Sequence, residues 1–451
     1  TSAHKDMEAM ENRAVENSAE KESRVFEVVG TRVLGPALNG FIVWVLKNAV
    51  RDGKKRLYFL ARDGYFMFRA AKLYAEKLSL PVECRYLSCS RYSLRLPMFH
   101  LDKEEAMEYI CRDSIGVNLT RIMNRAGLER EEQGRVLEEI KAVGRENTPI
   151  PYVSLEETKR KLAASTAFME ALVRHSREAM PALAGYLSQE GLLEGKKEGK
   201  EDALVDSGWV GSMQKTLNRL LKHMGREKEL EGYYWGLYEL PPGVAREQYH
   251  CYYFSPEGQL RRKVYFNNNL FEAVFSAPHG MTIAYEERDG RYAPVYTSVT
   301  DERRKQMQRL EGSLLRYVRE ASEALRDIDS ADCRREKRRM APLLKRFMGK
   351  PTREEAEVFG RMFFCDDVLE YAHHPLAELM TEKELRANHA INKILVMTGL
   401  RKEEIEESAW FEGSAVMSSE RPGRHLFWYG IYKYLLHIRQ MYMWRKSNGR
   451  K

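Results

Sequence analysis

Two stretches decide the fold, Leu57-Tyr-Phe-Leu-Ala-Arg-Asp-Gly-Tyr-Phe-Met-Phe-Arg69 and Ala203-Leu-Val-Asp-Ser-Gly-Trp-Val-Gly-Ser-Met-Gln-Lys-Thr-Leu217. In each, a short apolar run ends in a turn of charged or small residues, and a pattern of helical spacing follows at once. This order predicts a buried strand, a turn at its carboxyl end, and a helix whose amino terminus faces the same side. Because α/β sheets bind ligands at the carboxyl ends of their strands, the two turns predict one shared site.

The composition is that of a soluble globular protein: of 451 residues, 43% are hydrophobic and 31% charged. The length exceeds one ordinary core and predicts two domains. The net charge of +8 is compatible with an anionic ligand, a nucleic acid or a membrane surface and selects none of them. The apolar run Phe41–Leu46 is far shorter than the roughly 18 residues of a membrane span, and no signal peptide is visible, so we expect a cytoplasmic protein.

Patterning along the chain predicts three regions. Residues 1–24 read as a polar leader, residues 25–300 as an α/β domain with a parallel, Rossmann-like sheet, and residues 301–451 as a mostly α-helical domain. Helical spacing over about 102–193 predicts an insertion between sheet elements. Predicted strands cover 57–61, 83–88, 203–205, 233–238 and 249–254.

The first turn, Arg62-Asp63-Gly64, has the residue types of a phosphate site. Gly64 allows backbone N–H groups to face an anion, and Arg62 can add a bidentate contact. Asp63 can hold a sugar hydroxyl or a metal ion, or act in catalysis. The alternative is a tight turn in which Asp63 caps the next helix.

The second turn, Asp206-Ser-Gly-Trp-Val-Gly-Ser212, combines an acid, two glycines and two serines ahead of a helix. That combination fits a phosphosugar cradle. Asp206 would hold Mg²⁺ or ribose-type hydroxyls and act in catalysis. The N–H and hydroxyl groups of four further residues would contact phosphate oxygens: Ser207, Gly208, Gly211 and Ser212. Alternatively, Ser212 is only the N-cap of the helix.

Weaker candidates follow elsewhere. Ser90, Arg91 and Arg95 come after the strand at 83–88 and either line the same anion site or form a basic surface turn. Glu272 and His279 lie in the site-like stretch 267–280 and are either an acid–base pair or structural residues.

Two basic segments bear on partners. The run Arg334–Arg339 predicts a solvated helix face, and without interleaved aromatic residues it predicts no specific nucleic acid. Residues 426–446 are aromatic, helical in pattern and basic at their end. They predict a docked core helix, or else a helix that contacts a membrane surface or a partner.

Placed together, these segments resemble the core of the type I phosphoribosyltransferases. Leu57–Ala70 followed by Pro81–Tyr92 is similar to the pyrophosphate loop region of that family, and Ala203–Leu217 to its ribose 5-phosphate loop. Ser207 stands where the family has the second acid of a pair. The resemblance implies a phosphoribosyltransferase-like sheet and Mg²⁺-dependent transfer.

A broader resemblance involves Leu60–Gly64, Ser90–Pro97, Asp206–Gln214 and Trp410–Ser414. These segments look like the carboxyl-terminal region of bacterial proteins described as predicted HAD-superfamily hydrolases, which accompany glycosyltransferases of surface-polysaccharide synthesis. No Asp-x-Asp pair follows a hydrophobic strand ahead of Leu57, so the HAD nucleophile is not found.

These observations lead to one expectation and two alternatives. We expect a cytoplasmic domain that binds a phosphorylated sugar or sugar nucleotide with Mg²⁺ and transfers a phosphoribosyl or glycosyl group in surface-polysaccharide synthesis. A glycosyltransferase or a HAD domain is the expected protein partner. The alternatives are a non-catalytic scaffold or sensor that keeps the phosphate cradle, and a HAD phosphohydrolase partner domain without its own nucleophile.

Overall fold

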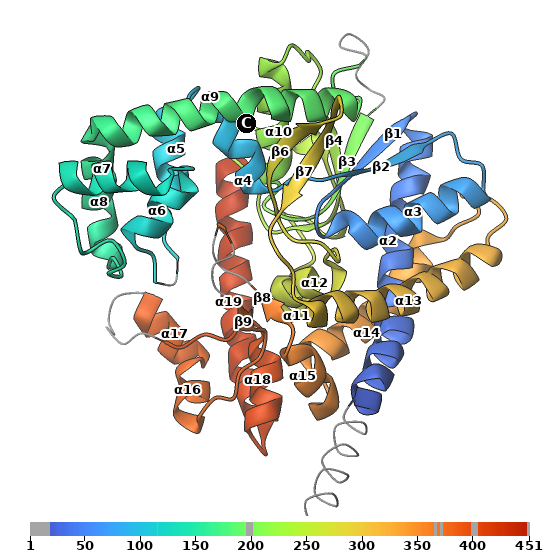
Figure 1. The fold of residues 1–451 in the computed structure, drawn as a ribbon. Coiled ribbons are helices and arrows are strands. Elements are labelled where there is room, and N and C mark those ends of the chain that lie inside the picture. Colours follow the sequence, from blue (N-terminus) through green and yellow to red (C-terminus); the bar gives the residue numbers. More distant parts are fainter. Residues whose placement is uncertain are drawn as a thin grey trace, which may run out of the picture.

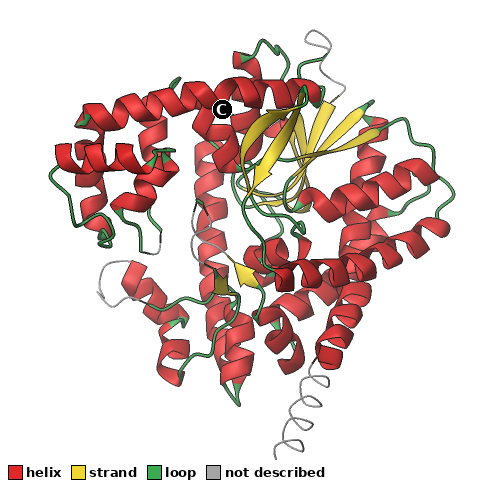
Figure 2. Ribbon diagram, in the orientation of Figure 1, coloured by secondary structure: helices red, strands yellow, loops and turns green. Residues whose placement is uncertain are grey.

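In the computed structural model, the described residues are 19–114, 116–194, 202–364, 368–369, 373–397 and 405–448. Helices surround one five-stranded sheet (Figures 1 and 2). Most of the predicted polar leader, residues 1–18, lies outside the described residues, and a helix begins at Ala19 and runs to Arg51.

The sheet confirms the predicted α/β, Rossmann-like class. Its strands are β1 (Arg56–Leu60), β2 (Glu83–Leu87), β3 (Asp202–Trp209), β4 (Glu231–Leu237) and β5 (Tyr249–Phe254). They lie in the order β2-β1-β3-β4-β5, and all neighbours are parallel. The strand order reverses direction between β1 and β3, which makes the carboxyl ends of these two strands the topological switch point of a doubly wound sheet.

Alternating side chains of β1 enter two different cores, because the sheet is covered on both faces. Phe59 packs with α2 (Gly35–Arg51) and α3 (Gly64–Lys77). Tyr58 and Leu60 pack with α9 (Thr166–Gln189) and α10 (Ser212–His223) on the opposite face (Figure 1). Burial on both faces explains why the strands read as continuous apolar runs.

The insertion between β2 and β3 is helical in its described residues, as predicted. Its elements are α4 (Arg91–Arg95), η2 (Leu96–Met98), α5 (Lys103–Ile110), α6 (Leu119–Arg125), α7 (Arg130–Glu139), α8 (Tyr152–Ala164) and α9 (Thr166–Gln189). Helices α5 to α8 and the first half of α9 bury a hydrophobic cluster of their own.

Between β3 and residue 296, the chain contains several short elements besides β4 and β5. They are α10 (Ser212–His223), η3 (Arg246–Gln248), α11 (Leu260–Tyr265), α12 (Asn268–Phe275) and an antiparallel hairpin, β6 (Thr282–Arg288) and β7 (Arg291–Tyr296). The hairpin was not among the predicted strands. Its turn residues Asp289 and Gly290 both have positive φ, which is the backbone that Asp-Gly favours in two-residue hairpins.

The region after the hairpin is helical, as predicted. It contains α13 (Asp301–Glu323), α14 (Cys333–Gly349), α15 (Arg353–Gly360), α16 (Glu382–Ala387), α17 (Ala390–Met397), α18 (Phe411–Ser418) and α19 (Pro422–Asn448), with the short pair β8 (Phe363–Phe364) and β9 (His374–Pro375). Helices α13 and α14 pack directly on α2, so this region shares one core with the sheet.

One helix among the described residues, Ala19–Arg51, has the length and composition of a membrane span. It includes η1 (Gly30–Leu34) and α2. Of its most apolar window, 72% is buried inside the protein, where it packs on α3, α13 and α14. The short apolar run Phe41–Leu46 lies inside this helix.

Candidate functional site

The two predicted turns open into one cavity at the switch point. This switch-point cavity has a volume of about 470 Å³. Its lining includes Arg62 and Asp63 after β1 and Asp206, Ser207 and Gly208 of β3. Because β1 and β3 pair directly, side chains 144 residues apart in sequence face the same space.

The second turn is shorter than predicted. Strand β3 continues to Trp209, because Asp206, Gly208 and Trp209 pair with β4. Asp206 therefore belongs to an ordered sheet, and only Val210 and Gly211 separate the end of β3 from α10. Gly208 has a φ of 113°, and a Cβ there would lie 2.4 Å from the carbonyl oxygen of Gly236, so the position requires glycine.

A hydrogen bond joins the two turns. The buried hydroxyl of Ser207 donates to the carboxylate of Asp63. Ser207 of β3 thus positions the acid that follows the neighbouring strand, β1.

Three half-buried carboxyl groups line the cavity together: Asp63, Asp206 and Glu272 of α12. Burial raises the pKa of Asp63, while the Ser207 hydrogen bond and the charges of Arg62 and Arg91 oppose that rise. Burial and the charge of Asp63 raise the pKa of Asp206 to about 8. The same two causes raise the pKa of Glu272 to about 7, and the Trp209 indole N–H donates to its carboxylate.

Burial is the largest cause of all three shifts, so the cavity favours the protonated form of each carboxyl. Near neutral pH the cluster retains protons, or it accepts a cation in their place. Among the described residues, no group of three or more His, Cys, Asp or Glu side chains is arranged to hold a metal ion. A Mg²⁺ ion needs only one or two carboxylates when waters and substrate phosphates complete its shell, so Asp206 and Asp63 suit that mode.

Arginines from three segments line the same cavity as the carboxyls. Arg62 and Arg91 line the cavity, and Arg112 joins them from the segment after α5. Buried Arg125 fixes that segment, because it donates to the carbonyl oxygens of Ile110 at 3.0 Å and of Arg112 at 2.6 Å. Neither Arg112 nor Arg125 lies in a local motif, so the sequence alone did not predict their place at the site.

A second cavity, the side cavity, adjoins the first and has a volume of about 420 Å³. The two share four lining residues: Arg62, Asp63, Asn269 and Glu272. Hydroxyl and aromatic groups line the side cavity, among them Ser298, Thr300 and Phe363. Asp63 and Glu272 therefore line both cavities, whereas Asp206 lines only the switch-point cavity.

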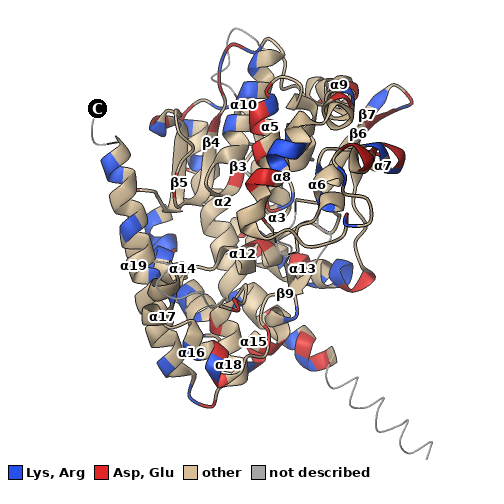
Figure 3. Cartoon of the chain, turned by 90° about the vertical axis from the view of Figure 1, so that its left-hand side faces the viewer, with Lys and Arg blue, Asp and Glu red and all other residues tan. Residues whose placement is uncertain are grey.

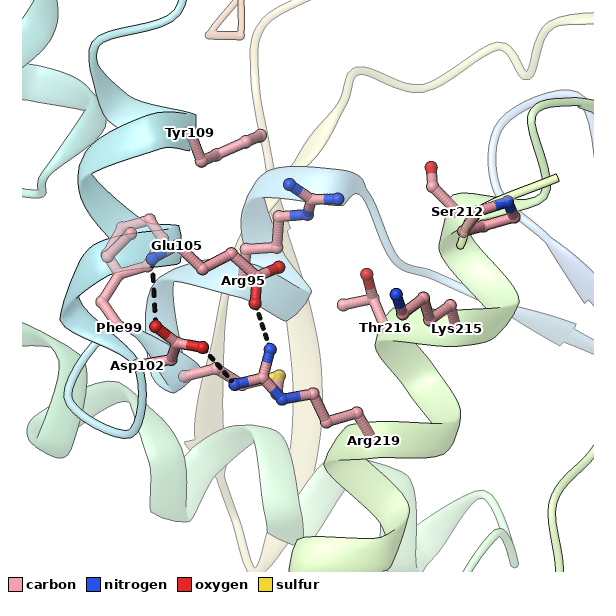
Figure 4. A pocket seen from close by; sticks show the side chains of 12 residues that line it. Arg95, Phe99, Asp102, Glu105, Tyr109, Ser212, Lys215, Thr216 and Arg219 are labelled. Carbon is pink, nitrogen blue, oxygen red and sulfur yellow. Dashed lines mark hydrogen bonds and ion pairs between the residues drawn. The ribbon is translucent and has the colours of Figure 1, made fainter. Parts of the chain in front are cut away.

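A third pocket, of about 220 Å³, lies between α5 and α10 (Figure 4). It shares Tyr109 and Ser212 with the switch-point cavity. Arg95 lies here, with its guanidinium 4.7 Å from the centre of the Tyr109 ring. Arg219 pairs with Asp102 at 2.9 Å. Arg95 thus lines this third pocket and does not line the switch-point cavity.

Three predicted phosphate-binding residues have local structural tasks. Gly64 is buried at the start of α3, where a Cβ would lie 3.0 Å from the backbone of Phe59. Gly211 has a φ of 68° and precedes α10. Neither lines the cavity, whereas Ser90 does. The Ser90 hydroxyl caps α4 and donates to the carbonyl oxygen of Thr282 at 2.7 Å.

His279 does not line any of these three cavities. Its Nδ1 lies 2.8 Å from the carbonyl oxygen of Gly280, so Nδ1 carries a proton and donates it. Its Nε2 lies 2.8 Å from the Tyr86 hydroxyl and accepts from it in the neutral ring. Burial lowers the pKa of His279, and the Tyr296 ring stacks on it.

No protein-family model matches the chain, and no curated protein matches it in sequence. The chemistry of the switch-point cavity is therefore inferred from its own residues.

Proposed function

We propose that the switch-point cavity binds a phosphorylated sugar or sugar nucleotide and transfers its glycosyl or phosphoribosyl group. The observation that carries this proposal is that Asp63 and Glu272 line two adjoining cavities, with Asp206 and several arginines in the lining of the first. The resemblances of the sequence suggest surface-polysaccharide synthesis as the setting and a glycosyltransferase or HAD domain as the partner.

The phosphate of the donor would lie near Arg62 and Arg91. Both line the cavity, and each can form a bidentate contact with a phosphate. Helix α10 begins at Ser212 in the same lining, so its amino terminus adds a partial positive charge. The switch point of a doubly wound sheet is also where such folds bind nucleotides and related ligands.

The carboxyls fit a cation. Asp206 and Asp63 would hold Mg²⁺, because both line the same cavity and one or two carboxylates are enough for Mg²⁺ when waters and substrate phosphates complete its shell. When bound, Mg²⁺ neutralises phosphate charge and orients the leaving group. The Ser207 hydroxyl fixes the orientation of Asp63 for this purpose.

The side cavity provides the place for an acceptor. Its hydroxyl-rich wall and Phe363, whose residue surface is 41% exposed, suit a carbohydrate ring. Glu272 lies in the wall between donor and acceptor, and its pKa of about 7 suits a general base near neutral pH. In this scheme the acceptor hydroxyl loses its proton to Glu272 as its oxygen bonds to the anomeric carbon and the phosphate leaves.

One observation favours a second candidate, a non-catalytic scaffold or sensor. Ser207 is buried and already bonded to Asp63, so the second acid of the resembled family is replaced by a structural contact. A phosphate cradle without turnover would need only the arginines and the α10 amino terminus.

The test is thermal unfolding with phosphosugars, sugar nucleotides and phosphoribosyl pyrophosphate, each with and without Mg²⁺. Asp206→Asn is compared with Asp289→Asn, which makes the same change in the exposed β6–β7 turn. A ligand at a hundred times its Kd stabilises the protein by about 2.7 kcal/mol. Stabilisation that Asp206→Asn loses and Asp289→Asn keeps supports the proposal, and equal binding by both variants contradicts it. Binding without product from any carbohydrate acceptor favours the scaffold.

A further inference from the structure

A basic groove lies between α11 and α14, away from the switch-point cavity. This α11–α14 groove has a volume of about 410 Å³. Four cationic and two tyrosine side chains dominate its lining: Arg261, Arg262, Arg338, Lys345, Tyr253 and Tyr265. Its lining contains no Asp or Glu. Figure 3 shows the Lys and Arg residues of α14 beside α19.

The cations of the groove are held by aromatic rings and backbone rather than by acids. The Arg262 guanidinium lies 5.0 Å from the centre of the Tyr253 ring and donates to the Tyr253 carbonyl oxygen at 2.7 Å. Lys345 Nζ lies 4.1 Å from the centre of the Tyr265 ring. Within the described part of the chain, no carboxylate forms an ion pair with any of the four groove cations.

Two of the cations are fully available to a ligand. Arg261 and Arg338 are exposed, one on α11 and the other on α14. The uncompensated charge is also felt by a neighbour, Lys337. Burial and the nearby charges of Arg262 and Arg334 lower the pKa of Lys337 to about 8. The groove is therefore a region of positive potential that its own residues do not neutralise.

The groove and the switch-point cavity have no lining residue in common. Phe266 lines the groove, and its ring centre lies 5.2 Å from that of Trp209, which lines the cavity. Packed aromatic rings thus separate the two.

We propose that the α11–α14 groove is a second anion site, which binds a phosphate or diphosphate group through Arg261, Arg262, Arg338 and Lys345. Arginine donors match phosphate oxygens in pairs, and the tyrosine rings hold Arg262 and Lys345 in place before the ligand arrives. A soluble phosphorylated ligand and the headgroup of an anionic lipid present the same chemistry. The site does not depend on what the switch-point cavity binds.

The test compares Arg261→Gln/Arg338→Gln with Arg319→Gln/Arg335→Gln, which removes the same charge from exposed positions outside the groove. Pyrophosphate binding is measured by calorimetry in metal-free buffer. Sedimentation with phosphatidylglycerol vesicles, against phosphatidylcholine vesicles, is the second arm. Loss of one charge-assisted contact weakens binding about tenfold, so the groove variant should bind at least that much more weakly than the control.

Weaker binding by the groove variant in either measurement, calorimetry or sedimentation, supports the proposal. The measurement in which it is seen identifies the source of the phosphate. Weaker pyrophosphate binding by the groove variant assigns a soluble ligand. Vesicle binding lost only in the groove variant assigns a lipid headgroup. The proposal is overturned if wild type binds neither probe or if both double variants lose binding equally. It also fails if Arg91→Gln abolishes binding while the groove variant keeps it, because the anion then occupies the switch-point cavity.

Discussion

The hydroxyl of Ser207 in β3 donates a hydrogen bond to the carboxylate of Asp63, which follows β1, and so joins the two turns at the switch point. A donor to a carboxylate stabilises its ionised form, and this bond accordingly opposes the rise in the pKa of Asp63 that burial causes. The same hydrogen bond thus holds the two turns together and favours the ionised form of Asp63 in the cavity.

The first prediction concerns this coupling. Ser207→Ala, Asp63→Asn and the double variant form a double-mutant cycle measured by chemical denaturation at pH 8. We expect a coupling free energy of about 1 kcal/mol, because each single change removes the same hydrogen bond. Additive effects would show that the two side chains do not interact in solution.

The second prediction is a pH dependence of stability. The pKa of Asp206 rises from 3.8 to about 8 in the folded protein. The folded state therefore keeps a proton that the unfolded chain releases between these values, and the free energy of unfolding falls as the pH rises from about 4 to about 8. Glu272 acts in the same direction, because its pKa rises from 4.5 to about 7.

The variant Asp206→Asn isolates this effect, because the amide imitates the protonated acid at all pH values. It should be more stable than wild type at pH 8, nearly equal to it at pH 4, and less dependent on pH between them. Denaturation midpoints in urea across this range measure the difference. Parallel pH profiles for the two proteins would exclude a raised pKa at Asp206.

The third prediction concerns Gly208. A Cβ at this position would meet the carbonyl oxygen of Gly236 at 2.4 Å, on backbone with a φ of 113°. Gly208→Ala should therefore lower the free energy of unfolding by about 3 kcal/mol or more, within the range of severe backbone substitutions. Gly243→Ala is the control, since Gly243 also has positive φ but nothing lies within 4 Å of its Cβ position. The control should cost about 1 kcal/mol.

The features that the sequence predicts well are those that local pattern encodes. Runs such as Leu57–Leu60 are apolar because both faces of the sheet are covered, and this produced the correct strands and fold class. Asp63 and Asp206 could be predicted as site residues because each stands at the end of such an apolar run. Their proximity was expected because the carboxyl ends of parallel strands lie at one edge.

Other features depend on contacts that no local pattern contains. Pairing with β4 extends β3 through Trp209, so the predicted loop from Asp206 is largely strand. Arg112 lines the cavity only because buried Arg125 holds its segment in place. The β6–β7 hairpin is different, because its Asp289-Gly290 turn is a local signal from which the sequence could have predicted it.

The last prediction separates the two acid–base candidates of the stretch 267–280. Glu272 lies in the wall shared by two cavities, with a pKa of about 7. His279 is held outside that lining by Tyr86 and by the Gly280 carbonyl. Glu272→Gln should slow product formation about a hundredfold, as loss of a general base does, and should remove the rise in rate near pH 7.

His279→Gln should instead act on stability. Its ring is neutral in the folded protein, so the variant loses the contacts with Tyr86 and Gly280, about 1 kcal/mol of hydrogen bonding, and leaves the rate unchanged. Because burial lowers the pKa of His279 below 6.5, its ring should stay neutral as the pH falls past that value, which a histidine NMR titration can follow. A hundredfold slower His279→Gln with full stability would transfer the general base from Glu272 to His279.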